Sequence, residues 1–158
     1  MIISGRREGQ TLIETALVLF LLLLILLGIT EFARAWYTKS SLKNAVRQGA
    51  RVAAVTPAAN IIVDSFDCIN PTCPILTNTI QNAVCCQPGI PRNFQDNTQV
   101  TLECRNSSGG VVSPCNLIPP GGSIKVSATS SFSYIIGNSP WPWPKSVAIT
   151  TDASMRYE

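Results

Sequence analysis

The hydrophobic and polar positions divide the chain into stretches with different periodicities. A nearly continuous apolar run, ALVLFLLLLILLGI, covers residues 16–29 and contains no charge. Extended back to Leu12, the run comprises 18 residues and is interrupted by Glu14 and Thr15. Because a helix rises about 1.5 Å per residue, this length just spans a hydrocarbon core of about 30 Å. The run therefore predicts a transmembrane helix.

The helical pattern continues beyond the apolar run as far as Val55. Residues 30–55 contain no proline, and apolar or small residues recur at the three- and four-residue spacing of one helix face. Pro57 follows and is expected to end the helix. An unbroken helix over residues 10–55 would be about 70 Å long. We expect its first half to lie in the membrane and its second half to form an amphipathic stalk.

Two rows of residues at four-residue spacing mark different faces of the stalk. Ala45, Gly49 and Ala53 form a small-residue row, which permits close approach of another backbone. The second row is basic and consists of Lys39, Lys43, Arg47 and Arg51. It fits either anionic lipid headgroups or the acidic faces of partner helices.

After Val55 the periodicity becomes that of strands. Apolar and polar residues alternate over residues 98–102, 124–136 and 147–157, which is typical of a sheet with one buried face. A short helix is expected over residues 75–84. The apolar stripe of the stalk would cover the sheet. The pattern predicts an α+β fold in which a long N-terminal helix packs on a small antiparallel sheet with disulfide-stapled loops.

Charge is sparse and unevenly distributed. Lys, Arg, Asp and Glu make up 13% of the chain, and the first 55 residues hold seven of the 12 basic residues but three of the nine acidic ones. Residues 56–158 hold five basic and six acidic residues, which gives a net charge of 5 − 6 = −1. This near-neutral region has no phosphate-binding character, so nucleic acid is not an expected partner.

An even number of cysteines follows the apolar run: Cys68, Cys73, Cys85, Cys86, Cys104 and Cys115. In a small domain this is typical of disulfide stapling in an oxidising compartment. Six cysteines allow 15 connectivities. We favour the pairs Cys68–Cys73 and Cys104–Cys115, because each closes a short polar loop. The alternative is a set of buried free thiols.

The chain contains no histidine. Ser-His-Asp and Cys-His catalysis, histidine metal sites and haem attachment through C-x-x-C-H are therefore excluded. A zinc site made of cysteines alone is not expected, since there is no C-x-x-C pair and the adjacent Cys85 and Cys86 are poorly spaced as ligands. We expect no catalytic residue, no metal and no cofactor. The enzymatic alternative is a membrane-anchored redox protein that uses Cys85 and Cys86.

The junction before the apolar run carries the main functional signal. Residues 1–9 form a short basic leader that ends in Gly9, an accessible cleavage point. Cleavage there would expose an amine on Gln10 and make Glu14 the fifth residue of the mature chain. A charged residue in a membrane helix costs up to about 3 kcal/mol at the helix centre. The Gln10 amine of a neighbouring subunit would neutralise Glu14, align the helices and favour their transfer from lipid into a filament.

This arrangement resembles the type IV pilin superfamily, and most closely the TadE-like proteins, the pseudopilins of the tight-adherence (Tad/Flp) pilus. The resemblance rests on residues 9–55 and, more weakly, on the closing sequence Met155-Arg156-Tyr157-Glu158, since an M-R-x-E ending is common in that family. It implies that Gly9 is the prepilin peptidase site, Gln10 the mature N-terminus and Glu14 the recognition and assembly glutamate.

The resemblance also implies partners and a location. The partners are a prepilin peptidase, other pilin or pseudopilin subunits and an inner-membrane assembly platform, and the role is pilus assembly, adhesion and biofilm formation. The expected organisation is a leader over residues 1–9, a transmembrane and stalk helix over residues 10–55, and a pilin-like domain over residues 56–158. This domain would be periplasmic or part of an extracellular pilus. The basic residues that follow the apolar run favour the opposite orientation, but the cysteines and the resemblance outweigh them.

Several other interpretations stay open. Thr11-x-x-Glu14 also matches a helix capping box, in which Glu14 would satisfy backbone N–H groups. The first 35 residues also fit a secretory signal peptide cleaved after Ala35. The helix could instead only anchor an extracytoplasmic adhesin or binding module, and Trp141 and Trp143 would then be candidate ligand contacts. A type II secretion pseudopilin would share the helix but not the downstream domain.

Overall fold

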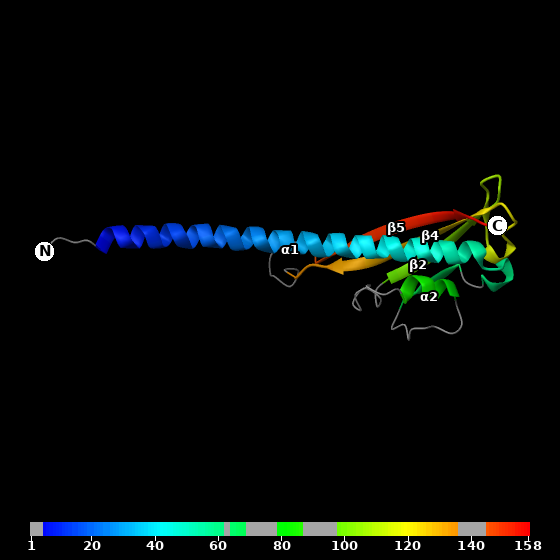
Figure 1. The fold of residues 1–158 in the computed structure, drawn as a ribbon, viewed down its shortest axis with the longest axis horizontal. Helices are drawn as coiled ribbons and strands as arrows, with labels where there is room; N and C mark the ends of the chain where they lie inside the picture. Colours follow the sequence, from blue (N-terminus) through cyan, green and yellow to red (C-terminus); the bar gives the residue numbers. More distant parts are fainter. Residues whose placement is uncertain (1–4, 62–63, 69–78, 87–97, 136–144) are drawn as a thin grey trace. The chain divides into compact units, whose positions relative to one another are not determined.

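The computed structural model describes residues 5–61, 64–68, 79–86, 98–135 and 145–158. The chain divides into two compact units, Met1–Ala35 and Trp36–Glu158. Helix α1, Gly5–Val55, contributes residues to both units (Figure 1). It ends at Val55, as the sequence predicts, but it begins at Gly5 rather than at Gln10. The reason is that Arg6, Arg7 and Glu8 are good helix formers and no breaker separates them from the apolar run.

The first unit is formed by the N-terminal part of α1. In the described part of the chain, α1 is the one helix that is long and apolar enough to cross a membrane. The large apolar side chains between Leu12 and Ile29 are exposed all around the helix. Leu12, at the start of this segment, is 69% exposed, and Ile29, at its end, is 61% exposed. A helix that is apolar on every side needs a membrane or other helices around it.

The second unit contains a five-stranded antiparallel sheet with the order β1-β2-β4-β5, in which β3 also pairs with β2. The strands are β1 (Ser65–Asp67), β2 (Thr98–Arg105), β3 (Val111–Val112), β4 (Ser123–Ser133) and β5 (Ser146–Arg156). The structure confirms the predicted strands that correspond to β2, β4 and β5. Strands β1 and β3 were not predicted, because three and two residues are too few to show a periodicity.

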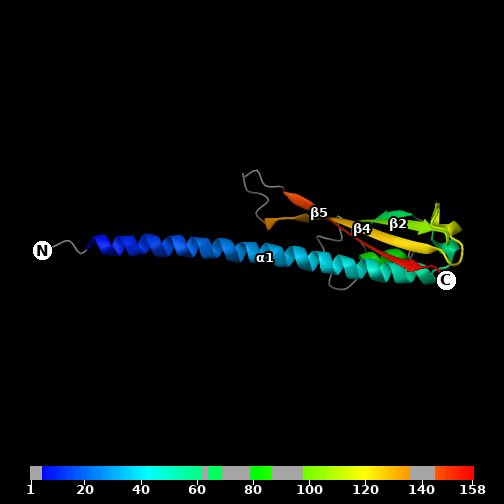
Figure 2. The ribbon, with the colours of Figure 1, turned by 90° about the horizontal axis from the view of Figure 1, so that it is seen from above.

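Short helices connect and cover the strands. Helix α2 is Thr79–Cys85, and the 3₁₀ helices are η1 (Ala58–Asn60) and η2 (Cys115–Leu117). Helix α2 lies in the predicted region 75–84 and continues one residue beyond it, while the first residues of that region lie outside the described ranges. In both views α2 and the last turns of α1 lie beside the same sheet (Figures 1 and 2).

The core lies between the inner face of the sheet and these two helices. Alternate residues of β4 are fully buried, including Ile124, Val126 and Ala128 at 0% exposure. Residues of α1 such as Leu42 and Val46 belong to the same hydrophobic cluster. Burying one such aliphatic side chain contributes about 1.5–3 kcal/mol. The second part of α1 is therefore an integral element of the second unit, as the predicted cover of the sheet requires.

The outer face of the sheet is polar. It carries the ion pair Lys125–Asp152 (3.4 Å) and a contact of 3.1 Å between the hydroxyls of Thr129 and Thr150. Exposed pairs of this kind contribute at most about 1 kcal/mol. The inner face therefore dominates stability, and the outer face is available for contacts with other molecules.

Candidate functional site

Gly9 and Gln10 lie on the exposed surface of α1 in the first unit. A Cβ atom added to Gly9 would have no heavy atom within 4 Å, so no part of the described structure covers this peptide bond. Both residues are helical in the uncleaved chain. A protease that cuts after Gly9 would therefore need to unwind the helix locally, and the two glycines Gly5 and Gly9 make these turns less costly to unwind.

Glu14 is the one charged residue between Gln10 and Thr30. It is exposed on α1, with Leu12, Ile13 and Leu17 exposed around it. A carboxylate in this setting is favourable in water but costly in hydrocarbon without a partner. The geometry leaves Glu14 open to a cationic group from another molecule.

The capping-box interpretation of Thr11 and Glu14 is wrong for the uncleaved chain. Helix α1 begins at Gly5, so both residues lie inside it, where backbone N–H groups already bond to carbonyls four residues earlier. The hydroxyl of Thr15 donates to the carbonyls of Thr11 (2.8 Å) and Leu12 (3.0 Å), as is usual for a threonine inside a helix. The carboxylate of Glu14 is therefore not required as a helix cap.

The exposed apolar surface of the first unit is large. Fourteen large apolar side chains from Leu12 to Ile29 are at least 44% exposed. At about 1.5–3 kcal/mol per buried side chain, transferring them from water stabilises the chain by on the order of 20–40 kcal/mol. This stretch is therefore stable only in a membrane or within a bundle of helices.

The small-residue row packs inside the second unit. Ala45 and Ala53 are 0% exposed, and Gly49 is buried. A Cβ atom on Gly49 would overlap the Cγ2 methyl group of Val84 on α2 and lie 3.8 Å from Val126 on β4. The element that approaches this row closely thus belongs to the same chain.

The basic row lies on the opposite, exposed side of α1. Lys39, Lys43, Arg47 and Arg51 are all exposed, and no ion pair involving them occurs in the described ranges. The sequence has no acidic residue between Glu31 and Asp64. Neighbouring like charges at four-residue spacing destabilise a helix by about 0.2–0.5 kcal/mol per pair. An acidic or anionic partner would remove this repulsion.

The disulfides confirm one preferred pair and correct the other. Cys104 bonds to Cys115, as predicted. Cys68 bonds to Cys85 rather than to Cys73, and the two Cα atoms are 5.5 Å apart. Cys68 follows β1 and its N–H donates to the Thr98 carbonyl, so strand pairing brings it to the end of α2. The prediction of a Cys68–Cys73 disulfide, which was based on the short loop it would close, is therefore wrong.

The remaining cysteines bear on the redox alternative. Cys86 is also disulfide-bonded, while Cys73 lies outside the described residues. Neither Cys85 nor Cys86 thus offers a free thiolate, the species that a redox enzyme needs for attack. Among the residues that the structure describes, no cluster of three or more metal-ligating side chains occurs. Trp141 and Trp143 also lie outside the described residues.

The helix and sheet define an α+β protein whose apolar N-terminal helix can anchor it in a membrane. Residues 9–51 match the family model described as TadE-like protein, which confirms the resemblance found in the sequence. The match covers 43 of the 158 residues and begins at Gly9. TadE-like proteins are associated with the Tad pilus, and the match suggests the same association for this chain. No significant match to a curated protein or to a solved structure was found.

Proposed function

We propose that this chain is a minor pilin or pseudopilin of a Tad-type apparatus, which acts as a structural subunit in pilus assembly and not as an enzyme. A prepilin peptidase would cleave it after Gly9 in the inner membrane. The domain that follows would be extracytoplasmic and would contribute to adhesion and biofilm formation. The observation that carries the proposal is the carboxylate of Glu14, which is the one charge in residues 10–30, a stretch of α1 whose large apolar side chains are exposed on every side.

Assembly follows from the electrostatics of this helix. After cleavage, the new Gln10 amine is positively charged and lies four residues from Glu14 along the chain. Within hydrocarbon, an ion pair between this amine of one subunit and Glu14 of the next would offset the cost of about 3 kcal/mol for the unpaired carboxylate. Because both partners are at fixed positions on identical segments, the pair would also set the axial register between helices.

The family match supports this proposal because it covers the segment in which cleavage and helix pairing would occur. It begins at Gly9 and includes Glu14 and the whole apolar run. The disulfides Cys68–Cys85 and Cys104–Cys115 support an extracytoplasmic location, because such bonds persist in oxidising compartments. Partner subunits and the assembly platform would contact the apolar surface and the exposed basic row.

The signal-peptide alternative makes a different prediction for the mature N-terminus. Cleavage after Ala35 would leave the complete second unit, which begins at Trp36. Cleavage after Gly9 and cleavage after Ala35 would thus both leave an intact second unit, so the folding of this unit does not distinguish the two cleavage sites. Cleavage at either site requires local unwinding of α1. Gly5 and Gly9 make this less costly at the first site, whereas no glycine lies between Gly28 and Gly49 around Ala35.

The experiment is to express the full chain with its secretion apparatus and determine the mature N-terminus by mass spectrometry. We expect a chain that begins at Gln10, and Gly9→Val should prevent its formation. Glu14→Ala should leave the protein in the membrane but remove it from sheared filaments, while the neighbouring control Thr15→Ala should assemble normally. A chain that begins at Met1 or Trp36 would contradict the proposal and favour a merely anchored adhesin. Normal assembly of Glu14→Ala would contradict the assembly role of Glu14.

A further inference from the structure

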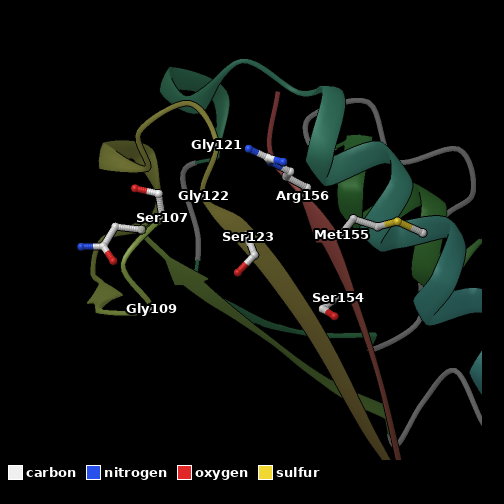
Figure 3. A pocket seen from close by; sticks show the side chains of 9 residues that line it. Ser107, Gly109, Gly121, Gly122, Ser123, Ser154, Met155 and Arg156 are labelled. Carbon is white, nitrogen blue, oxygen red and sulfur yellow. The ribbon is translucent and has the colours of Figure 1, made fainter.

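A polar pocket of about 380 Å³ opens on the outer face of the sheet, where β4 begins and β5 ends (Figure 3). Two turns border it, one over residues 106–110 and one over residues 119–122. The M-R-x-E ending contributes to the same place, since Met155 and Arg156 line the pocket. All of these residues belong to the second unit.

The two turns are built with defined geometry. Gly109 and Gly121 have φ angles of 87° and 82°, which favour glycine. The Asn106 side-chain oxygen accepts hydrogen bonds from the Gly110 N–H (2.7 Å) and from the Ser108 hydroxyl (2.8 Å). The N–H of Gly121 donates to the Tyr157 carbonyl (2.9 Å). These bonds fix the rim of the pocket and join it to the C-terminal segment.

The side chains around the pocket offer donors without internal partners. No hydrogen bond within the described part of the chain involves the hydroxyls of Ser107, Ser123 and Ser154 or the side-chain nitrogen of Asn106. The register places Ser123 directly opposite Arg156. In Figure 3, the serines and Arg156 are distributed around the open space. The pocket can therefore donate several hydrogen bonds at once.

Arg156 gives the pocket an uncompensated positive charge. Three cations occur on β2, β4 and β5, and two of them are in ion pairs: Arg105 with Glu103 (2.6 Å) and Lys125 with Asp152 (3.4 Å). Arg156 is the third and has no carboxylate partner among the described residues. No carboxylate lines the pocket. Guanidinium groups bind carboxylates through two parallel hydrogen bonds.

We propose that this pocket binds an acidic saccharide, with the carboxylate of a uronic acid unit on Arg156 and its ring oxygens on the serine and asparagine donors. A sugar acid fits this lining because neutral donors from three serines and one asparagine surround one cation, which matches the many hydroxyl and ring oxygens around a single carboxylate. The volume lies at the lower end of the range for small-ligand sites. The proposal does not depend on cleavage or filament assembly.

Binding should be measured by calorimetry with the full chain in nanodiscs, using trigalacturonate as the probe. We expect saturable binding, a loss of at least tenfold in affinity for Arg156→Gln, and a smaller loss for Ser123→Ala. Arg156→Lys keeps the charge without the paired donors and should give an intermediate affinity. The matched control is Lys145→Gln, which removes an equal charge from the residue just before β5, at the opposite end of the strand from Arg156.

Three further probes test what the pocket recognises. Neutral maltotriose is a saccharide without a carboxylate, triglutamate carries carboxylates on a peptide, and inorganic phosphate is a simple anion. Each should bind at least tenfold more weakly than trigalacturonate. Equal binding of triglutamate or phosphate would overturn the assignment to a saccharide. Absence of saturable trigalacturonate binding, or unchanged affinity of a folded Arg156→Gln variant, would overturn the site itself.

Discussion

Replacing Gly49 by alanine is expected to destabilise the second unit, although the same change in an exposed helix normally stabilises it. Alanine gains about 1 kcal/mol over glycine in helix propensity. Here, however, the new methyl group would overlap Val84, which is 1% exposed. Extra methyl groups in a packed core cost about 1–3 kcal/mol. Because the disulfide at Cys85 restrains the end of α2, Val84 has little freedom to move. We therefore take the upper part of this range, about 2–3 kcal/mol, which leaves a net loss of about 1–2 kcal/mol.

A double-mutant cycle isolates this contact. Val84→Ala alone removes two buried methyl groups and should cost roughly 2 kcal/mol. When Gly49→Ala is combined with it, the methyl group added on α1 occupies part of the space that the valine methyl groups vacate. The combined loss should therefore be smaller than the sum by at least about 1 kcal/mol. Thermal unfolding of the full chain in nanodiscs, followed by circular dichroism, measures these differences, at about 4 °C for each kcal/mol.

The matched control is Gly28→Ala on the same helix, where an added Cβ would have no neighbour within 4 Å. This variant should not lower the unfolding temperature of the second unit. If Gly49→Ala were as stable as the parent protein, or if the two substitutions were additive, the close approach between α1 and α2 would be refuted.

The other predictions concern the disulfides and a buried hydroxyl. Peptide mapping without reductant should yield Cys68–Cys85 and Cys104–Cys115 peptides, and removing either bond by serine substitution should cost about 3 kcal/mol, since the sequence separations are 17 and 11. A Cys68–Cys73 peptide would contradict this connectivity. Thr151→Val should stabilise the second unit by about 1 kcal/mol, because the Thr151 hydroxyl is buried without a hydrogen bond. Thr129→Val on the outer face is the control, and an equal gain there would refute the explanation.

The sequence predicted the elements with the longest periodic patterns. The end of α1 and the strands β2, β4 and β5 follow from helical spacing, proline placement and strict alternation. The small-residue row indicated a close approach but not its partner, because spacing along one helix contains no information about the opposing surface. Only the structure shows Val84 and Val126 at that position.

The features that sequence reasoning missed depend on contacts between distant segments. Cys68 and Cys85 approach each other because β1 pairs with β2 and α2 packs on the sheet. The pocket at Arg156 joins two turns and the C-terminal strand. The glycine-rich turns and the M-R-x-E ending were visible as motifs, yet their proximity follows from the β4–β5 register. A pattern of residues within one segment can predict the structure of that segment, but it does not show which other segments it contacts in the fold.

The two parts of α1 should contribute to assembly in different ways. Leu42 and Val46 are core residues, and exposing both would cost about 3–6 kcal/mol, so this part of the helix does not separate readily from the sheet. In the assembly proposed above, contacts between subunits would use surfaces that the core does not occupy, among them the apolar first part of α1 and the exposed basic row. Substitutions at Gly49 should therefore lower subunit stability before assembly begins. Substitution of Glu14 should reduce assembly while the stability of the second unit stays unchanged.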